Sequence, residues 1–571
     1  MFIKKTPNRL RAVISFLLLA LFFFSIKLIL IQIFRSDHLR KIAQKQHNLL
    51  LELEPERGII YDRHMRPLST NLPAQSLYAV PSKIKNKNDL AEKLARITGQ
   101  SKDSFLDRLN RKKAFIWLAR KLPGRQYEEI KKINSDGLGF RRETKRYYPN
   151  AQLASQIIGF AGLDNIGLEG IELSFDKYLK GKLGWCLLLR DAKQRGIMLE
   201  EEFVPSQDGN DIVLTIDETI QFIAERALDE TFKKHNARGA TIVVINPKTG
   251  EILALANRPT FDLNNFDNSI AESHRNRAIC DFYEPGSVFK IVTASAALEE
   301  NKVQETDKFF CENGSYKVAN HILHDYRPHG TLTFKEVMMQ SSNIGVTKVA
   351  QILGPELVYK YAKLFGFGSL TGIDLPGEVQ GQNKPPEKWS KTSIGAVPIG
   401  QEVCVTAIQL VTAISAIAND GVLMRPFVIK RIQDKKGEII KEFHPQEIRR
   451  VITEKTAARM KDILAAVVAE GTGRGGQIPG YRAAGKTGTA QKVENGVYSH
   501  SKFTATFMGF VPVEDPKLAI VVSVDEPHPA YLGGTVSAPV FKRVAEDSLK
   551  YLKSLEEMEL VDLNENKRAA R

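Results

Sequence analysis

The stretch EPGSVFKIVTA, residues 284–294, places Ser287 and Lys290 three residues apart at the head of an apolar run. Residues at this spacing share one face of a helix, so the hydroxyl and the amine can meet. A serine beside a desolvated lysine is a nucleophile beside its base. A helix capped by the serine, with the lysine stem lying along apolar surface, explains the same residues, and Ser-x-x-Lys occurs three further times in the chain. The spacing alone therefore does not decide the chemistry.

Two further motifs follow Ser287 in the sequence. Ser341-Ser342-Asn343, a Ser-x-Asn pattern, begins 54 residues later, and Lys486-Thr487-Gly488-Thr489 begins 199 residues later. Earlier copies of the two patterns at 69–71 and 248–250 both precede Ser287, and the second fits a hairpin turn. Only one set has the order Ser-x-x-Lys, Ser-x-Asn, Lys-Thr-Gly, which belongs to a group of serine acyltransferases.

Serine acyl transfer needs two parts besides the nucleophile and its base. The tetrahedral intermediate needs an oxyanion hole, and the leaving amine needs a proton donor. The segments around Ser341 and Lys486 can supply these parts. The three motifs together therefore indicate an acyltransferase, which none of them indicates singly.

With these motifs the sequence resembles the class B penicillin-binding proteins, membrane-anchored D,D-transpeptidases that cross-link peptidoglycan, and most of all their division-specific subgroup. The resemblance spans nearly the whole chain. It includes RGIIYDR (57–63), RYYPNAQLASQIIGFAG (146–162), GLEGIELSFDKYLKGKLG (167–184), GEILALANRPTFDLNNF (250–266) and GKTGTAQK (485–492). It implies that β-lactams, which mimic the acyl-D-Ala-D-Ala terminus, acylate Ser287 stably.

The resemblance also implies a role for each motif residue. The expected catalytic set is Ser287, Lys290, Ser341, Asn343 and Lys486, and the expected substrate-binding set is Thr487, Gly488 and Thr489. Ser287 attacks the penultimate D-alanine carbonyl of a stem pentapeptide and releases D-alanine. Lys290 must be neutral to take the serine proton, and burial beside the positive Lys486 lowers its pKa.

The other motif residues serve the leaving group and the substrate. Ser341 passes a proton to the leaving nitrogen, and Asn343 holds the substrate amide or the Lys290 amine. Lys486 and the two threonine hydroxyls bind the terminal carboxylate. The backbone N–H groups of Ser287 and Thr489 form the oxyanion hole, and Gly488 leaves room for the substrate backbone.

Composition limits the other functions of the chain. Its 571 residues suggest about three or four structural units, and the net charge of +15 favours anionic surroundings such as acidic lipid or carboxylate-bearing polymers. It has no zinc-finger spacing, aromatic RNA-binding signature or long basic tract, so nucleic acid is not an expected partner. No Cys-x-x-Cys pair occurs among the four cysteines, Cys186, Cys280, Cys311 and Cys404. This spacing favours free thiols, with a single disulfide in an oxidising compartment as the alternative.

Residues 12–34, AVISFLLLALFFFSIKLILIQIF, predict one transmembrane helix. Basic residues within 1–11 place that tail in the cytoplasm and the catalytic domain outside the plasma (inner) membrane, in the periplasm or its equivalent. A cleaved signal peptide is the rival interpretation, but no small-x-small site follows the apolar run. Lys27 within the run either snorkels or contacts another membrane protein.

The remaining chain divides by pattern into two domains and a tail. Residues 35–236 mix short β-like pieces with basic helical stretches such as 104–122, and predict a pedestal (dimerisation-type) domain. Residues 237–552 predict the transpeptidase domain, and 553–571 a polar, mobile C-terminal tail. In the second domain we expect strands near 239–257, 482–490, 503–511 and 517–525, and helices over 405–421 and 536–552.

The expected fold class is α+β. Strands at both ends of the transpeptidase domain predict a central antiparallel sheet built from distant segments and flanked by helices, with a helical subdomain, as in serine β-lactamases. The edge of that sheet would be free to display a catalytic strand. Gln401-Glu402 departs from the more usual Gly-Gln-Gly pattern of the family at Glu402, which leaves the geometry of that loop open.

Several functional alternatives stay open. Ser-Ser-Asn and the short outer domain favour septal synthesis over an elongation role, and a sporulation role is also compatible. The outer part has no glycosyltransferase acid motif, so a SEDS-type glycan polymerase and other division proteins are expected partners beside the membrane and the stem peptides. A β-lactam sensor or β-lactamase shares the three motifs, and the long pedestal and the lack of a Glu-x-x-Leu-Asn motif count against a class A β-lactamase. A non-catalytic scaffold is the other alternative.

One cluster offers metal-capable side chains. His321, His324, Asp325 and His329 lie close together in sequence, with Cys311 upstream. Their spacing fits no standard zinc motif, so a polar loop leading to Ser341 is the expected interpretation. We expect neither a metal nor a cofactor.

Overall fold

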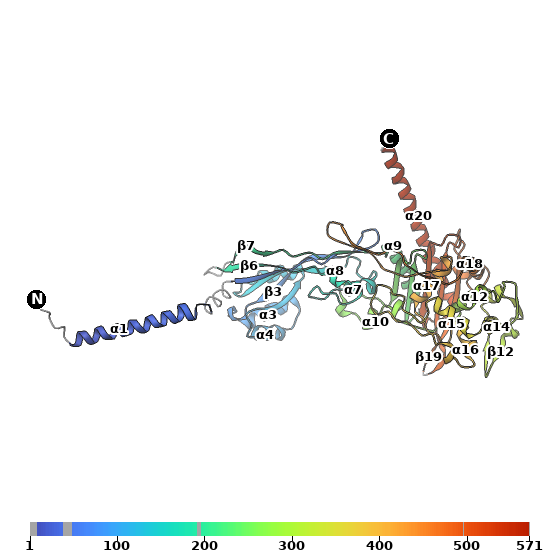
Figure 1. Cartoon of the computed structure of the whole chain (residues 1–571), viewed down its shortest axis with the longest axis horizontal. Coiled ribbons are helices and arrows are strands. Elements are labelled where there is room, and N and C mark those ends of the chain that lie inside the picture. The colour runs from blue at the N-terminus through green and yellow to red at the C-terminus, as the bar shows by residue number, and fades with distance from the viewer. Residues whose placement is uncertain (1–7, 38–47, 191–195, 495, 570–571) are drawn as a thin grey trace. The chain divides into compact units, whose positions relative to one another are not determined.

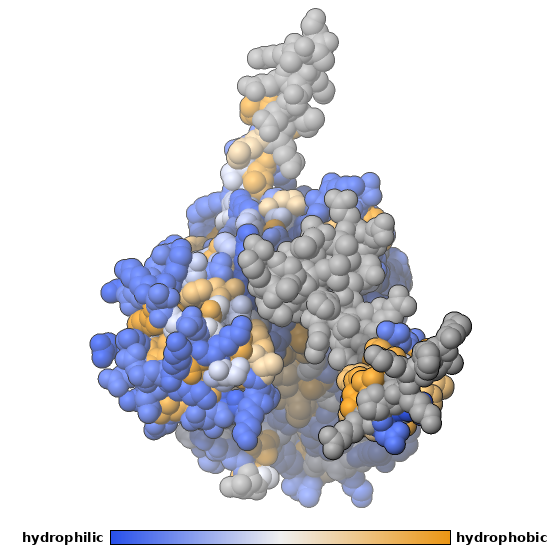
Figure 2. All heavy atoms as spheres, turned by 90° about the vertical axis from the view of Figure 1, so that its left-hand side faces the viewer, coloured by the Kyte–Doolittle hydropathy of each residue, from blue (hydrophilic) through white to orange (hydrophobic). Residues whose placement is uncertain are grey.

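The computed structural model describes residues 8–37, 48–190, 196–494 and 496–569 (Figure 1). The chain separates into two compact units. The smaller unit draws on Met1–Glu56 and Gly181–Asp208, and the larger on Arg57–Lys180 and Gly209–Arg571. Figure 2 gives the surface seen from the left-hand side of Figure 1, where hydrophilic side chains predominate and hydrophobic ones gather in separate patches.

The smaller unit begins with α1 (Asn8–Ile29), which continues as a π-helical turn over Leu30–Phe34. Leu10–Phe34 is long and apolar enough to cross a membrane, which confirms the apolar helix predicted over 12–34. Its large apolar side chains are exposed, Phe16 by 72%. Most of the tail predicted over 1–11 lies outside the described residues. The unit also contains an antiparallel sheet in the order β1 (Asn48–Leu53), β6 (Gly184–Arg190), β7 (Gly196–Val204).

The larger unit contains a seven-stranded mixed sheet of order β17-β16-β8-β2-β3-β4, with β5 paired to β3. Its strands are β2 (Ile60–Tyr61), β3 (Pro67–Ala79), β4 (Ile116–Leu122), β5 (Leu138–Tyr147), β8 (Asp211–Leu214), β16 (Ile429–Gln433) and β17 (Ile439–Glu442). Strands from both sides of residue 236 therefore share one sheet.

The composition of the basic stretch 104–122 suggested one helix, but the structure does not form a single helix there. Helix α4 (Lys102–Asn110) ends within it, and residues 116–122 form β4. Strand β4 pairs with β3 and buries Ile116 and Leu118 in a core that also contains Leu90 of α3 (Lys87–Thr98) and Phe105 of α4. A partner strand about forty residues earlier decides this conformation, so local periodicity could not reveal it.

A buried ionic cluster fixes the beginning of the larger unit. Arg57 Nε lies 2.5 Å from Glu172 Oε2, and its Nη1 lies 2.6 Å from Asp176 Oδ1. Arg146 Nε contacts the other oxygen of Glu172 at 2.6 Å. The Arg57 and Glu172 side chains are almost fully buried, so each depends on the other to offset desolvation.

The sheet that organises the motif residues is antiparallel, with the order β10-β9-β21-β20-β19. Its strands are β9 (Gly239–Ile245), β10 (Ile252–Arg258), β19 (Ala484–Glu494), β20 (Val497–Val511) and β21 (Leu518–Asp525). The first and last parts of the domain thus meet in one sheet, as predicted. Strand β19, which carries Lys486, lies at its edge.

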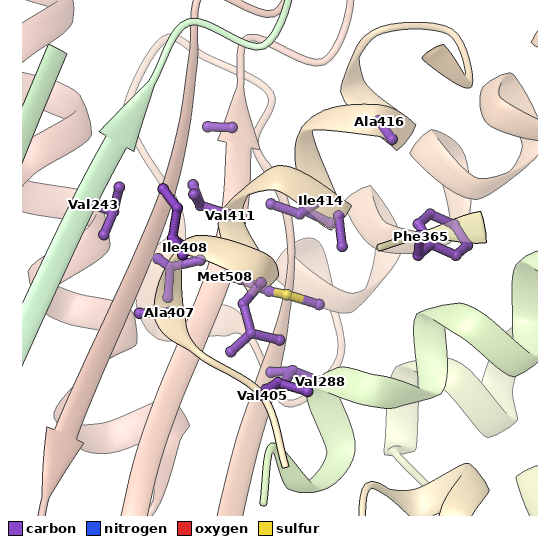
Figure 3. Packing of buried hydrophobic residues seen from close by; sticks show 14 of the residues in the cluster. Val243, Val288, Phe365, Val405, Ala407, Ile408, Val411, Ile414, Ala416 and Met508 are labelled. Atoms are coloured by element: carbon purple, nitrogen blue, oxygen red, sulfur yellow. The ribbon is translucent and has the colours of Figure 1, made fainter. Parts of the chain in front are cut away.

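Alternate residues of this sheet pack on opposite faces, as the two-residue strand period requires. Val243 and Met508 pack with α17 (Ala407–Ala418), whereas Val244 and Phe507 pack with α9 (Glu218–Lys234) and α20 (Ala538–Ala569). Figure 3 shows α17 against the sheet, with Ile408 and Val411 toward Val243, and Met508 beside Val288 and Val405. The predicted sheet flanked by helices is thereby confirmed.

Helices between β10 and β19 form the rest of the domain. Besides α17, the longer ones are α12 (Lys290–Glu299), α13 (Phe334–Gln340), α14 (Asn343–Leu353), α15 (Pro355–Leu364) and α18 (Glu454–Ala469). A small hairpin, β12 (Ser315–Val318) and β13 (His321–His324), precedes α13.

The last helix exceeds its predicted length. We expected a helix over 536–552 and then a polar, mobile tail, whereas α20 continues to Ala569 and extends beyond the body of its domain (Figure 1). No proline or glycine occurs after Pro539, and leucine, glutamate and lysine are strong helix formers, which accounts for the continuation.

Candidate active site

A short 3-10 turn, Gly286–Phe289, carries Ser287 into α12. Val288 and Phe289 are fully buried and anchor the turn, whereas Ser287 is only half-buried. Gly286 has φ +60°, and a Cβ there would lie 3.0 Å from Thr489 O. The turn therefore packs directly against β19.

Lys290 begins α12 three residues after Ser287 and is fully buried. Its Nζ lies 2.6 Å from Ser341 O, 2.8 Å from Asn343 Oδ1 and 3.2 Å from Ser341 Oγ. Among the described residues, these hydrogen bonds go to the Ser-x-Asn motif and not to Ser287. Burial lowers the pKa of Lys290 to about 7, although the charge of Asp325 opposes the shift. A substantial fraction of this amine is therefore neutral at pH 7.

The Ser-x-Asn motif occupies the sharp turn between α13 and α14. Ser341 ends α13 in the left-handed region, with φ +58°, and Ser342 caps α14 by accepting the Gly345 N–H at 2.9 Å. Asn343 Nδ2 donates to His324 O at 2.8 Å, which leaves Asn343 Oδ1 to accept from Lys290. The turn thus directs three acceptor atoms at one amine.

Lys486 comes to the same place from the sheet edge. Its Nζ donates to Ser341 Oγ at 2.8 Å and contacts Thr487 O at 3.3 Å, and the side chain is fully buried. Burial, and then the charge of Lys290, lower the pKa of Lys486 well below its ordinary value. We expected burial and the charge of Lys486 both to lower the pKa of Lys290; burial is the leading cause for both amines, and the opposing charge on Lys290 comes from Asp325. Ser341 Oγ lies between the two amines.

The rest of the Lys-Thr-Gly strand lines the turn of Ser287. A Cβ at Gly488 would lie 2.8 Å from Pro285 O, so only glycine allows this approach. The Thr487 hydroxyl pairs with that of Thr472 at 2.9 Å, and the Thr489 hydroxyl accepts the Gly533 N–H at 3.0 Å. All eight predicted residues therefore lie in or beside one site.

The earlier copies of the motifs lie elsewhere. Ser69 and Asn71 belong to β3 of the seven-stranded sheet. Lys248 lies in the turn between the antiparallel strands β9 and β10, which confirms the expected hairpin, and it pairs with Asp515 in the connection between β20 and β21.

Two contacting residues escaped the sequence analysis. Thr472 pairs with Thr487, and its Gly-Thr-Gly context carries no distinctive signal. Asp325 accepts hydrogen bonds from the Ser-x-Asn motif, although it had drawn notice only as a candidate metal ligand. His321 and His324 are exposed on β13. Within the described residues, no three His, Cys, Asp or Glu side chains gather as a possible metal site.

The Glu402 loop has an unusual conformation. Glu402 has φ +58°, a region that glycine enters more readily. Its carboxylate accepts from Ser393 Oγ at 2.6 Å, and its N–H donates to Glu284 Oε1 at 2.9 Å. Gly286 N–H donates to Gly400 O at 3.1 Å, so this loop buttresses the turn of Ser287.

Comparisons with known proteins agree with this geometry. Residues 240–546 match the penicillin-binding protein transpeptidase domain, and residues 52–214 match the penicillin-binding protein dimerisation domain. Among curated relatives, stage V sporulation protein D of Bacillus subtilis is 37% identical over 95% of this chain and 86% of that protein. Peptidoglycan D,D-transpeptidase FtsI of Escherichia coli is 31% identical over 92% of this chain and 88% of that protein.

A solved structure covers nearly the same length. Penicillin-binding protein 3 from Mycobacterium tuberculosis, complexed with aztreonam, superposes with a TM-score of 0.69 at 28% identity, covering 89% of this chain and 97% of that chain. The two domain matches, the relatives and the three convergent motifs agree. The chain belongs to the penicillin-binding proteins that join a dimerisation domain to a transpeptidase domain.

Proposed function

We propose that this D,D-transpeptidase cross-links peptidoglycan stem peptides through an acyl-enzyme on Ser287, with release of D-alanine. The observation that carries the proposal is the meeting of three distant segments at Lys290, Ser341 and Lys486, joined by consecutive hydrogen bonds of 3.2 and 2.8 Å. Burying two amines around one hydroxyl destabilises the fold. Such groups with lowered pKa values are typical of sites that carry out acid–base chemistry.

The first half-reaction begins with Lys290 as a neutral amine. Such an amine has two N–H donors, which Ser341 O and Asn343 Oδ1 accept, and one lone pair. The lone pair takes the proton of Ser287 while Oγ attacks the carbonyl of the penultimate D-alanine. The backbone N–H groups of Ser287 and Thr489 hold the resulting oxyanion.

Collapse of the intermediate needs a proton at the leaving nitrogen. The proton passes from Lys290 to Ser341 Oγ and from there to the amine of the departing D-alanine, so the C–N bond breaks as the serine ester remains. Lys486 supports Ser341 through its 2.8 Å hydrogen bond. Lys486, Thr487 and Thr489 also bind the terminal carboxylate of the substrate, and Gly488 lets its backbone approach.

The second half-reaction transfers the acyl group. The side-chain amine of a neighbouring stem peptide attacks the ester, forms the cross-link and returns Ser287 to its hydroxyl state. A β-lactam enters the first half-reaction but leaves a long-lived adduct. The aztreonam complex of the Mycobacterium tuberculosis relative supports this expectation.

For the cellular setting, we propose a single-pass protein of the plasma (inner) membrane, with residues 1–11 in the cytoplasm and the catalytic domain outside. The apolar helix Leu10–Phe34 and the basic residues before it support this topology. Residues 35–236 act as the pedestal, 237–552 as the transpeptidase domain and 553–571 as a C-terminal extension. A SEDS-type glycan polymerase and other division proteins are the proposed partners.

Septal synthesis during division is the proposed role, in keeping with the relatives named FtsI. A sporulation role is the second candidate, since stage V sporulation protein D is 37% identical over 95% of the chain. A conditional Ser287→Ala strain distinguishes them. Filamentous cells without septa support division, whereas normal vegetative septa with defective spores support sporulation.

The biochemical proposal is tested with the full-length protein in detergent. Incubation with a lipid-linked pentapeptide substrate and its polymerase is expected to release D-alanine and form cross-linked dimers, and Ser287→Ala is expected to abolish both. Rapid turnover of penicillin would favour a β-lactamase. Normal septa and normal spores in a strain carrying only Ser287→Ala would favour a scaffold.

A further inference from the structure

Asp325 follows β13 and holds the Ser-x-Asn motif from outside. Its Oδ1 accepts the N–H groups of Asn343 at 2.5 Å and Ile344 at 3.0 Å, and its Oδ2 accepts from Ser342 Oγ at 2.6 Å. Its own N–H donates to Gly314 O at 3.2 Å. One carboxylate therefore has three donors from consecutive residues 342–344.

These contacts determine the start of α14. The first amides of a helix have no partner within it, and a carboxylate there satisfies them and complements the helix dipole. Ser342 is the N-cap, and Asp325 accepts from the hydroxyl of that cap. Hydrogen bonds to an ionised acceptor are stronger than neutral ones, so the register of the motif depends strongly on Asp325.

The same segment orients the functional end of Asn343. His324 O accepts Asn343 Nδ2, so the two residues 324 and 325 hold both the side chain and the backbone of Asn343. Asn343 Oδ1 and Ser341 O then face Lys290. A change at Asp325 therefore reaches the amine through the motif.

Few charges act on Lys290. Asp325 is the negative group whose charge raises its pKa, and Lys486 on β19 is the other ionisable group at the site. Among the helices packed on α12, α14 carries Lys348, which pairs with Glu312. At the opposite end of α12, Glu300 contacts Lys360 of α15, and Glu299 accepts from the Thr453 hydroxyl before α18. Asp325 is thus the counter-charge at the catalytic end.

We propose that Asp325 is a positioning residue for acyl transfer, which fixes Ser341–Asn343 against Lys290 and sets a negative charge opposite the two buried amines. The inference rests on the proposed function of Ser287. Asp325→Asn keeps the size of the side chain, removes its charge and replaces an acceptor with a donor facing Ser342 or the helix amides.

Two effects on acylation follow, and they differ in their pH dependence. If the Ser341–Asn343 motif is held less firmly, the maximal acylation rate falls by about tenfold or more, because small displacements of reacting groups reduce the rate strongly. Loss of the charge lowers the pKa of Lys290 further, so neutral lysine persists to lower pH. The acidic limb of the rate profile then moves to lower pH, by about half a unit or more. A purely structural defect does not move that limb.

The experiment follows acylation of the full-length protein by penicillin in detergent between pH 5 and 9. Glu312→Gln is the matched control, because Glu312 lies before the same hairpin and pairs with Lys348 at 2.6 Å. Asp325→Asn is expected to lower the plateau and shift the acidic limb downward, and Glu312→Gln to do neither. An unshifted limb in Asp325→Asn, or an equal shift in both variants, overturns the inference.

A second variant covers the case in which Asp325→Asn does not fold, as judged by circular dichroism. Ser342→Ala removes the 2.6 Å hydrogen bond to Asp325 together with the cap on the Gly345 N–H, and it retains the charge of Asp325. It is expected to lower the plateau and leave the acidic limb in place, and wild-type rates at every pH would contradict the inference. Failure of the proposed function is distinct, because the wild-type protein itself would then form no adduct at Ser287.

Discussion

Replacement of Lys290 by methionine separates catalysis from stability. Burial lowers the pKa of Lys290 from its ordinary 10.5 to about 7. At about 1.4 kcal/mol for each tenfold change in the protonation equilibrium, discharging this amine costs the fold roughly 4 kcal/mol at pH 7. Methionine has a similar length and carries no such cost.

The lost hydrogen bonds oppose this gain. Lys290→Met leaves Ser341 O and Asn343 Oδ1 without their donor, at about 1 kcal/mol or somewhat more for each. We therefore expect the free energy of unfolding at pH 7 to rise by about 1–2 kcal/mol, while acylation falls by at least about a hundredfold for want of a base. Lys290→Arg keeps a charge at the same buried position, so its free energy of unfolding is expected to fall by several kcal/mol.

The same pKa difference determines how the free energy of unfolding changes with pH. Between pH 7 and 10.5 the unfolded chain keeps the proton on Lys290 and the folded chain does not, so the stability of the wild-type protein rises with pH through this window. The slope attributable to Lys290 is up to about 1.4 kcal/mol per pH unit and is absent in Lys290→Met. Urea unfolding of the full-length proteins at pH 7 and 9, followed by circular dichroism, measures it. A methionine variant less stable than the arginine variant, with the wild-type slope intact, would refute the reasoning.

Three further predictions concern positions around the site. Gly400→Ala is expected to slow acylation and to lower the free energy of unfolding by about 2 kcal/mol or more, because its Cβ would lie 2.1 Å from Gly286 O. The control Gly480→Ala has a similar φ and no atom within 4 Å of the new Cβ, so it is expected to cost only about 1 kcal/mol. Penicillin acylation rates and urea midpoints compare the two variants. Arg57→Ala removes a buried partner of the ionic cluster and is expected to cost about 3–5 kcal/mol, while the acylation rate of the folded fraction stays at the wild-type value. Lys27→Leu is expected to insert into the membrane but to lose the co-purifying polymerase, and an unchanged set of bound membrane proteins would show that Lys27 only snorkels.

The sheet of the transpeptidase domain was predictable from local patterns. Strand β9, its Asn-Pro-Lys-Thr-Gly turn and β10 combine apolar alternation with turn residues, and β20 and β21 lie close to their expected ranges. The order of the motifs along the chain predicted that Ser287 and Lys486 belong to one site. Both signals are local or linear, which is why sequence reasoning reached them.

Tertiary contacts explain what sequence reasoning missed. Residues 116–122 become a strand because β3 pairs with them, and α20 continues because nothing in its sequence ends it. The role of Asp325 depends on a hairpin that folds back on the start of α14, at a separation of 17 to 19 residues. Because Asp325 lies between His324 and His329 in the sequence, its carboxylate drew attention as a candidate metal ligand.

The most direct test of the central claim is intact-mass analysis of the full-length protein after exposure to penicillin, followed by peptide mapping. We expect one stable adduct per chain, located on Ser287, and none in Ser287→Ala. An adduct at any other residue, or an unmodified Ser287 in folded protein, would contradict the claim that Lys290, Ser341 and Lys486 serve this hydroxyl.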